Sequence, residues 1–208
     1  MDVITKLATS LDRKDEIPNQ ELARDLVAEQ DKDGIRQLVA LLSHTDKCIQ
    51  SDCIKVLYKI GAIAPELIAD HGSDFLKLLK SKNNRLQWGS MAALDAMAAS
   101  DPAFIYNSLT AIIDAAEKGS VITKDHAVNI LVQLCAIPLY AEDAFALLME
   151  QLLHSPVNQL PMYAERAMPV IRDDFRERFL AVLKTRLPDV EKAPKRKRLE
   201  RVMYAVKG

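Results

Sequence analysis

The residue types that carry most enzyme chemistry occur in this chain, but they are scattered. The four histidines, His44, His71, His126 and His154, occupy different places in the sequence pattern, and no zinc-binding signature is present. Asp125 and His126 are adjacent, so their side chains diverge on a helix. We therefore expect surface or turn histidines, and neither a metal site nor a metal cofactor.

The cysteines give no better case for catalysis. Cys48 and Cys53 are five positions apart with no second pair elsewhere, and Cys135 ends an apolar segment without an identifiable base. An odd number of cysteines, with no apolar leader at the N-terminus, indicates a reducing, cytoplasmic location. All three are interpreted as structural.

Motifs for binding phosphates or building a hydrolase nucleophile are also missing. The sequence contains no G-x-x-x-x-G-K, G-x-G-x-x-G or G-x-S-x-G, and the pair Asp173-Asp174 precedes a helix, where carboxylates favour the positive N-terminal end. We therefore expect a protein that is not an enzyme and that needs no cofactor.

The elements that must position any functional residue follow a repeat of 37 residues. Paired leucines recur at 41–42, 78–79 and 152–153, and segment 41–68 aligns with 78–105 without a gap, so that Pro65 and Pro102 coincide. The third unit is looser, with an extra loop predicted over 116–124. Stacked helical hairpins are the predicted structure.

The second helix of each hairpin carries an apolar face with spacings of 3, 1 and 3. Its four columns are Cys53/Ser90/Ala127/Ala164, Val56/Ala93/Ile130/Ala167, Leu57/Leu94/Leu131/Met168 and Ile60/Met97/Leu134/Ile171. These columns are the predicted core. Pro161 and Pro194 fit helix starts, whereas Pro169 falls within the fourth second helix and predicts a kink or an early end.

The expected organisation is one all-α domain over 1–208, with about five to six hairpins. The N-terminal capping hairpin is placed at 1–33, with Ile4, Leu7 and Leu11 in its first helix. Repeats follow at 34–69, 70–106, 107–141 and 142–172, and a basic C-terminal capping hairpin at 173–208.

The turns resemble those of HEAT repeats, in which an acidic or Asn turn is followed by an apolar, a basic and a small residue. The counterparts are Asp46, Ile49, Gln50 and Cys53, and then Asn83, Leu86, Gln87 and Ser90. The resemblance implies a right-handed α-α superhelix. Because Gln stands where the family usually has Arg, we expect the Asp to Arg ladder to be absent, and HEAT and armadillo types both remain open.

The same resemblance implies that second helices line a concave binding face. On that face the candidate contacts are Lys55, Tyr58, Trp88, Asp95, Asn129 and Arg166. Trp88 is the only tryptophan, and a large amphipathic ring suits a binding anchor. Packing of Trp88 against a neighbouring repeat explains it equally well, and both interpretations stay open.

Charge is unevenly distributed along the chain. Counting Lys and Arg against Asp and Glu, residues 61–162 carry −5 and residues 163–208 carry +6. The basic run comprises Lys195, Arg196, Lys197, Arg198 and Arg201, without interleaved aromatics. A solvated helix start is the favoured interpretation, with nucleic-acid contact as the alternative.

Three functions are consistent with this pattern. The favoured one is a non-catalytic scaffold that binds a protein or peptide along the second-helix face. The alternative is a nucleic-acid enzyme similar to the alkylpurine DNA glycosylases, which are small HEAT-like solenoids, although the acidic middle of this chain opposes DNA. The third is a subunit of a larger assembly or a homodimer formed through 136–140. No segment is apolar enough to predict membrane insertion.

Overall fold

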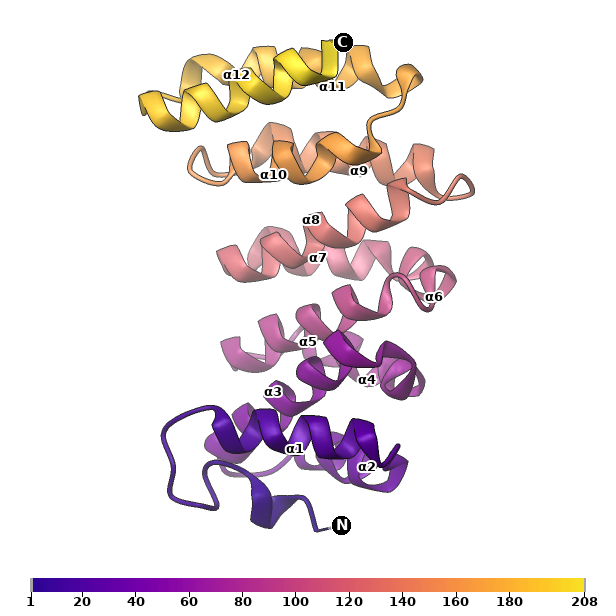
Figure 1. The fold of residues 1–208 in the computed structure, drawn as a ribbon, viewed down its shortest axis with the longest axis vertical. Helices are drawn as coiled ribbons and strands as arrows, with labels where there is room; N and C mark the ends of the chain where they lie inside the picture. Colours follow the sequence, from indigo (N-terminus) through magenta and orange to yellow (C-terminus); the bar gives the residue numbers. More distant parts are fainter. Residues whose placement is uncertain (1, 208) are drawn as a thin grey trace. The chain divides into compact units, whose positions relative to one another are not determined.

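The computed structural model describes residues 2–207, and these residues form helices and no strands (Figure 1). They divide into two compact units at Ala127, within the eighth α-helix. The α-helices of the first unit are α1 (Ile17–Ala28), α2 (Lys32–Leu41), α3 (Lys47–Ile63), α4 (Gly72–Leu78), α5 (Asn84–Met97), α6 (Pro102–Asn107) and α7 (Leu109–Lys118). Helix α8 (Val121–Cys135) spans the division, and α9 (Ala141–His154), α10 (Leu160–Ala167), α11 (Asp173–Arg186) and α12 (Ala193–Lys207) complete the second unit.

The 37-residue period reappears as equivalent helix starts in the first unit. Asp46 caps α3 by accepting a hydrogen bond from the Cys48 N–H, and Asn83 caps α5 by accepting one from the Arg85 N–H. Helices α2 and α3 pack as one hairpin and α4 and α5 as the next, while α1, α3 and α5 lie side by side (Figure 1). The predicted hairpins are therefore confirmed in this unit.

The predicted core columns of α3 and α5 are fully buried. The side chains at these eight positions have no exposed surface: Cys53, Val56, Leu57, Ile60, Ser90, Ala93, Leu94 and Met97. Gly89 lets the two helices approach closely, because a Cβ added there would lie 2.7 Å from a side-chain carbon of Ile54. Burial of this layer is the main stabilising contribution to the hairpin stack.

Two local predictions in the first unit are wrong. The first helix expected around Ile4, Leu7 and Leu11 is only a short 3-10 turn, Ile4–Lys6, and Asp12 then takes a positive φ of 53°. The segment forms no further helix before α1, and hydrogen bonds to α1 and α3 hold it in position. The loop expected over 116–124 is also mostly helical, because α7 continues to Lys118 and α8 begins at Val121.

The second unit confirms the interpretation of its prolines. Helix α10 ends at Ala167 and a 3-10 turn, Met168–Val170, follows, as Pro169 requires. Pro161 and Pro194 each occupy the second position of a helix. The early end of α10 makes the core prediction wrong for Met168, which is 37% exposed.

Aromatic packing joins α9 to α11 in this unit. The rings of Phe145 and Phe175 are stacked with centroids 3.9 Å apart and are fully buried. The Arg172 guanidinium lies 4.1 Å from the Phe175 ring, and that of Arg178 lies 4.8 Å from the Phe145 ring. Helices α10 and α12 also pack together, as do α11 and α12.

Residues 2–207 contain neither a membrane-spanning helix nor a cluster of metal-ligating side chains. None of the helices there combines the length and the apolar character needed to cross a lipid bilayer. The same residues contain no group of three or more His, Cys, Asp or Glu side chains placed to hold a metal ion.

Candidate binding surface on the second helices

Glutamine and asparagine side chains connect the N-terminal ends of α3 and α5. Gln50 Nε2 donates to the His44 carbonyl at 2.7 Å, and Asn83 Nδ2 donates to Gln50 Oε1 at 3.0 Å. Gln87 Nε2 donates to the Leu79 carbonyl at 3.0 Å in the next repeat. A ladder of neutral amide hydrogen bonds thus links the two repeats through the Gln residues that replace the usual Arg.

This ladder gives a direct stability prediction. Gln50→Ala is expected to lower the free energy of unfolding by about 1 kcal/mol, because it removes two hydrogen bonds at a partly buried site. Urea unfolding followed by circular dichroism measures the change. Gln37→Ala, at an exposed position of α2, is the matched control and should have almost no effect; equal losses in the two variants would contradict a structural role for the ladder.

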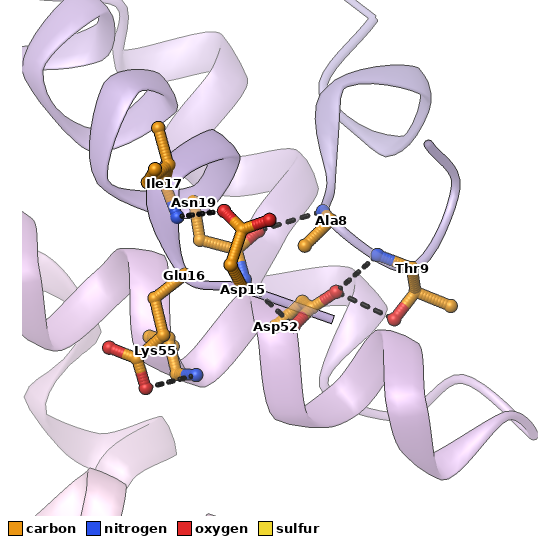
Figure 2. A network of polar contacts seen from close by, with 8 residues as sticks. All are labelled: Ala8, Thr9, Asp15, Glu16, Ile17, Asn19, Asp52 and Lys55. Atoms are coloured by element: carbon orange, nitrogen blue, oxygen red, sulfur yellow. Dashed lines mark hydrogen bonds and ion pairs between the residues drawn. The ribbon is translucent and has the colours of Figure 1, made fainter. Parts of the chain in front are cut away.

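A polar network fixes the N-terminal segment against α1 and α3 (Figure 2). Asp52 on α3 accepts hydrogen bonds from the Thr9 N–H at 2.8 Å and the Thr9 hydroxyl at 2.7 Å, and from Asn19 Nδ2 at 2.7 Å. Asn19 Oδ1 accepts one from the Ala8 N–H at 3.0 Å. Because Asn19 is buried and Asp52 almost buried, the network is a structural clasp around the start of the chain.

Lys55 is the candidate contact that lies deepest. Its Nζ is 2.8 Å from Glu16 Oε1, and only 11% of its side chain is exposed (Figure 2). The hydrogen bond from Lys55 holds the pKa of the Glu16 carboxyl below its usual value. Lys55 therefore forms an ion pair that joins α3 to the start of α1, and only a small part of its side chain is exposed.

Tyr58 and Trp88 form an aromatic pair between α3 and α5. Their ring centroids are 5.6 Å apart with a tilt of 47°, and both side chains are half-buried. Burial, together with the smaller effect of the Glu16 charge, raises the pKa of Tyr58 to about 12, so its hydroxyl is neutral. Trp88 thus packs on the neighbouring repeat and still presents part of its ring to solvent.

Asp95 lies further along the same face of α5 and contacts the first turns of α8. Its Oδ2 is 2.7 Å from His126 Nδ1, and the two side chains are 13% and 28% exposed. Asp125 is next to His126 in the sequence, but the carboxylate that the His126 ring contacts across the fold is that of Asp95.

The remaining candidates belong to the second unit. Asn129 on α8 and Arg166 on α10 are both half-buried there. Four of the six predicted residues, Lys55, Tyr58, Trp88 and Asp95, therefore lie on the neighbouring helices α3 and α5, where Tyr58 and Trp88 are in contact. We define these four as the aromatic face.

Three of the five residues of the basic C-terminal run, Lys195, Arg196 and Arg198, make polar contacts within the second unit, and Arg196 Nε lies 3.4 Å from Glu200 Oε1. Lys195 Nζ lies 2.7 Å from Asn158 Oδ1, and Arg198 forms a two-pronged contact with Glu165. The bond from Arg198 holds the pKa of the Glu165 carboxyl below its usual value. Lys197 and Arg201 are exposed. The run therefore joins α12 to α10 in addition to facing solvent.

No family model and no curated protein matches the chain. Among solved structures, a designed armadillo repeat protein in complex with the peptide (KR)4 is 14% identical, with a TM-score of 0.63 over 99% of this chain and 100% of that one. A computationally designed armadillo repeat protein for modular peptide recognition is 16% identical, with a TM-score of 0.60 over 97% of each chain. An engineered protein is 21% identical, with a TM-score of 0.62 over 100% of this chain and 99% of that one. The fold is thus of the armadillo and HEAT-like helical-repeat type.

Proposed function

We propose that this helical-repeat protein is a non-catalytic scaffold that binds an extended peptide segment of a partner protein on the aromatic face of α3 and α5. The observation that carries the proposal is the partly exposed Tyr58–Trp88 pair, held between two repeats on the second-helix layer. Large aromatic rings dominate the energy of many protein interfaces.

The surroundings of the pair support binding. Each ring already packs against the other, so little side-chain entropy is lost when a ligand covers them. Polar pairs border the rings, with Lys55 and Glu16 towards the N-terminal ends of the helices and Asp95 with His126 towards the other end. This arrangement of an apolar centre with a polar rim is typical of interfaces. Two of the similar solved structures are described as peptide-binding designs, which favours the same use of the fold.

A cytoplasmic location is part of the proposal. Cys48, Cys53 and Cys135 are all free thiols, and burial raises the pKa of both Cys53 and Cys135 to about 12. Unpaired thiols of this kind persist in a reducing compartment.

Because Trp88 is the only tryptophan, its fluorescence reports on the proposed site directly. Peptides selected from a random display library should change its emission, and Trp88→Ala should weaken their binding about tenfold or more in calorimetry. Tyr204→Ala is the matched control, because Tyr204 is 83% exposed on α12, and it should bind normally.

Circular dichroism separates loss of binding from loss of fold. Trp88→Ala should retain the helical spectrum and most of its melting temperature, because the ring is only half-buried. Unchanged peptide affinity in this folded variant would overturn the proposed site.

A further inference from the structure

A small polar pocket lies beside the aromatic face, at the N-terminal ends of α3 and α5. Its volume is about 300 Å³, and its lining includes four cations and two carboxylates: Arg13, Lys14, Lys55, Arg85, Asp15 and Asp52. All of these residues belong to the first unit. The pocket is therefore a charged recess, formed where the segment before α1 crosses the ends of two second helices.

Both carboxylates of the recess are already satisfied. Asp15 accepts a hydrogen bond from Arg13 Nε at 2.8 Å. It also accepts one from the Ile17 N–H at 3.0 Å (Figure 2). These bonds hold the pKa of the Asp15 carboxyl below its usual value. Asp52 accepts the three hydrogen bonds from Thr9 and Asn19 described above. Neither carboxylate needs a further cation.

The cations of the recess are not all satisfied. Arg13 pairs with Asp15, and Lys55 pairs with Glu16. Within residues 2–207, Lys14 and Arg85 make no ion pair, and both are exposed at the pocket. They come from separate elements, the segment before α1 and the first turn of α5, so the fold brings two uncommitted positive charges to one recess. The positive N-terminal end of α5 adds to the same field.

The recess lies one helical turn from the aromatic pair. Lys55 precedes Tyr58 by three residues on α3, and Arg85 precedes Trp88 by three residues on α5. Three residues of helix rise by about 5 Å. An extended peptide advances by about 3.3 Å per residue and its alternate side chains point to the same side, so a side chain two positions from the residue on Trp88 reaches the recess.

We propose that this recess receives a carboxylate side chain of the bound peptide, so that the partner segment is acidic next to its apolar anchor. The proposal rests on the proposed function and adds the charge of the ligand. It also distinguishes this chain from the similar designed protein that is described with the basic peptide (KR)4. Binding through Lys14 and Arg85 should weaken as salt is added, because both cations are exposed.

The chain contains its own reporter for the recess. Cys48 is exposed and lines the pocket, whereas Cys53 and Cys135 are buried with pKa values raised to about 12. N-ethylmaleimide should therefore modify Cys48 alone in the folded protein, and mass spectrometry gives the rate. A ligand in the recess should slow this reaction, while a ligand confined to the aromatic pair should change only Trp88 emission.

The test uses two matched five-residue peptides on the full chain, with leucine at positions 1 and 5, alanine at positions 2 and 4, and either glutamate or lysine at position 3, so that the charged side chain and the leucines point to the same side of an extended peptide. The acidic peptide should change Trp88 emission and slow Cys48 modification severalfold, and the basic peptide should do neither at equal concentration. The double variant Lys14→Gln with Arg85→Gln should bind the acidic peptide about five- to tenfold more weakly. Lys82→Gln, an exposed lysine outside the recess, is the control and should bind normally.

The outcomes separate this inference from the proposed function. Equal Trp88 responses to both peptides, with Cys48 unprotected, would overturn the acidic-ligand inference and leave the aromatic face as the binding site. Absence of any Trp88 response to both peptides and to library-selected ligands would overturn the proposed function itself. Unchanged acidic-peptide affinity in the double variant would also overturn the inference.

Discussion

Replacing Arg186 with alanine is expected to lower the free energy of unfolding of the second unit by about 3 kcal/mol. Arg186 on α11 is only 8% exposed, and its guanidinium donates to the carbonyls of Leu152, Leu153 and Ser155. Its Nε also donates to Asp189 Oδ2 at 2.8 Å. These carbonyls lie at the C-terminal end of α9, where no intrahelical donor remains. Removing the guanidinium therefore takes this donor from the Leu153 and Ser155 carbonyls, whereas the Leu152 carbonyl keeps the hydrogen bond from the Ser155 hydroxyl.

Two further variants isolate this role. Arg186→Lys keeps the charge but not the planar fork, so it should recover only part of the lost stability. Arg176→Ala, on the same helix, removes an arginine that is 45% exposed and pairs only with Asp173, and should cost little. Urea unfolding and hydrogen exchange of the last turn of α9 measure the effect. If Arg186→Ala lowers the free energy of unfolding no more than Arg176→Ala does, Arg186 does not stabilise the C-terminal end of α9.

Replacing Asp52 with alanine should destabilise the first unit by a similar amount, about 3 kcal/mol. The change removes the acceptor for three hydrogen bonds and leaves the Thr9 amide and the Asn19 side chain without that partner. The N-terminal segment has only a short 3-10 turn of its own, so its order depends on this carboxylate. We expect the segment to detach before the helices unfold.

Local probes can follow that detachment. In Asp52→Ala the amides of Ala8 and Thr9 should exchange faster, and trypsin should cut sooner after Arg13 and Lys14. Asp33→Ala is the matched control, because Asp33 is 74% exposed and contacts only Arg36. If the N-terminal segment stays protected in the Asp52 variant while the control behaves normally, the clasp in Figure 2 does not determine the order of this segment.

The candidate site was only partly predictable. Trp88 could be selected because it is unique and replaces a smaller residue in the repeat, and the period placed Tyr58, Lys55 and Asp95 on the same helix faces. The period could not show that Tyr58 and Trp88 touch, since that depends on how closely α3 and α5 approach. The sequence did not predict the charged recess, because Lys14 lies in an irregular segment and Arg85 belongs to none of the apolar columns.

The amino-acid sequence by itself determined the helical hairpins, the buried columns of α3 and α5, and the end of α10 at Pro169. Periodicity, capping and proline chemistry act over a few residues, so they can be read along the chain. Only the tertiary structure decided the path of residues 2–16, the pairing of Asp95 with His126, and the placement of Lys14 and Arg85 around one recess. These arrangements bring together residues that are far apart in sequence, and their geometry depends on the packing of neighbouring elements, which no local pattern encodes.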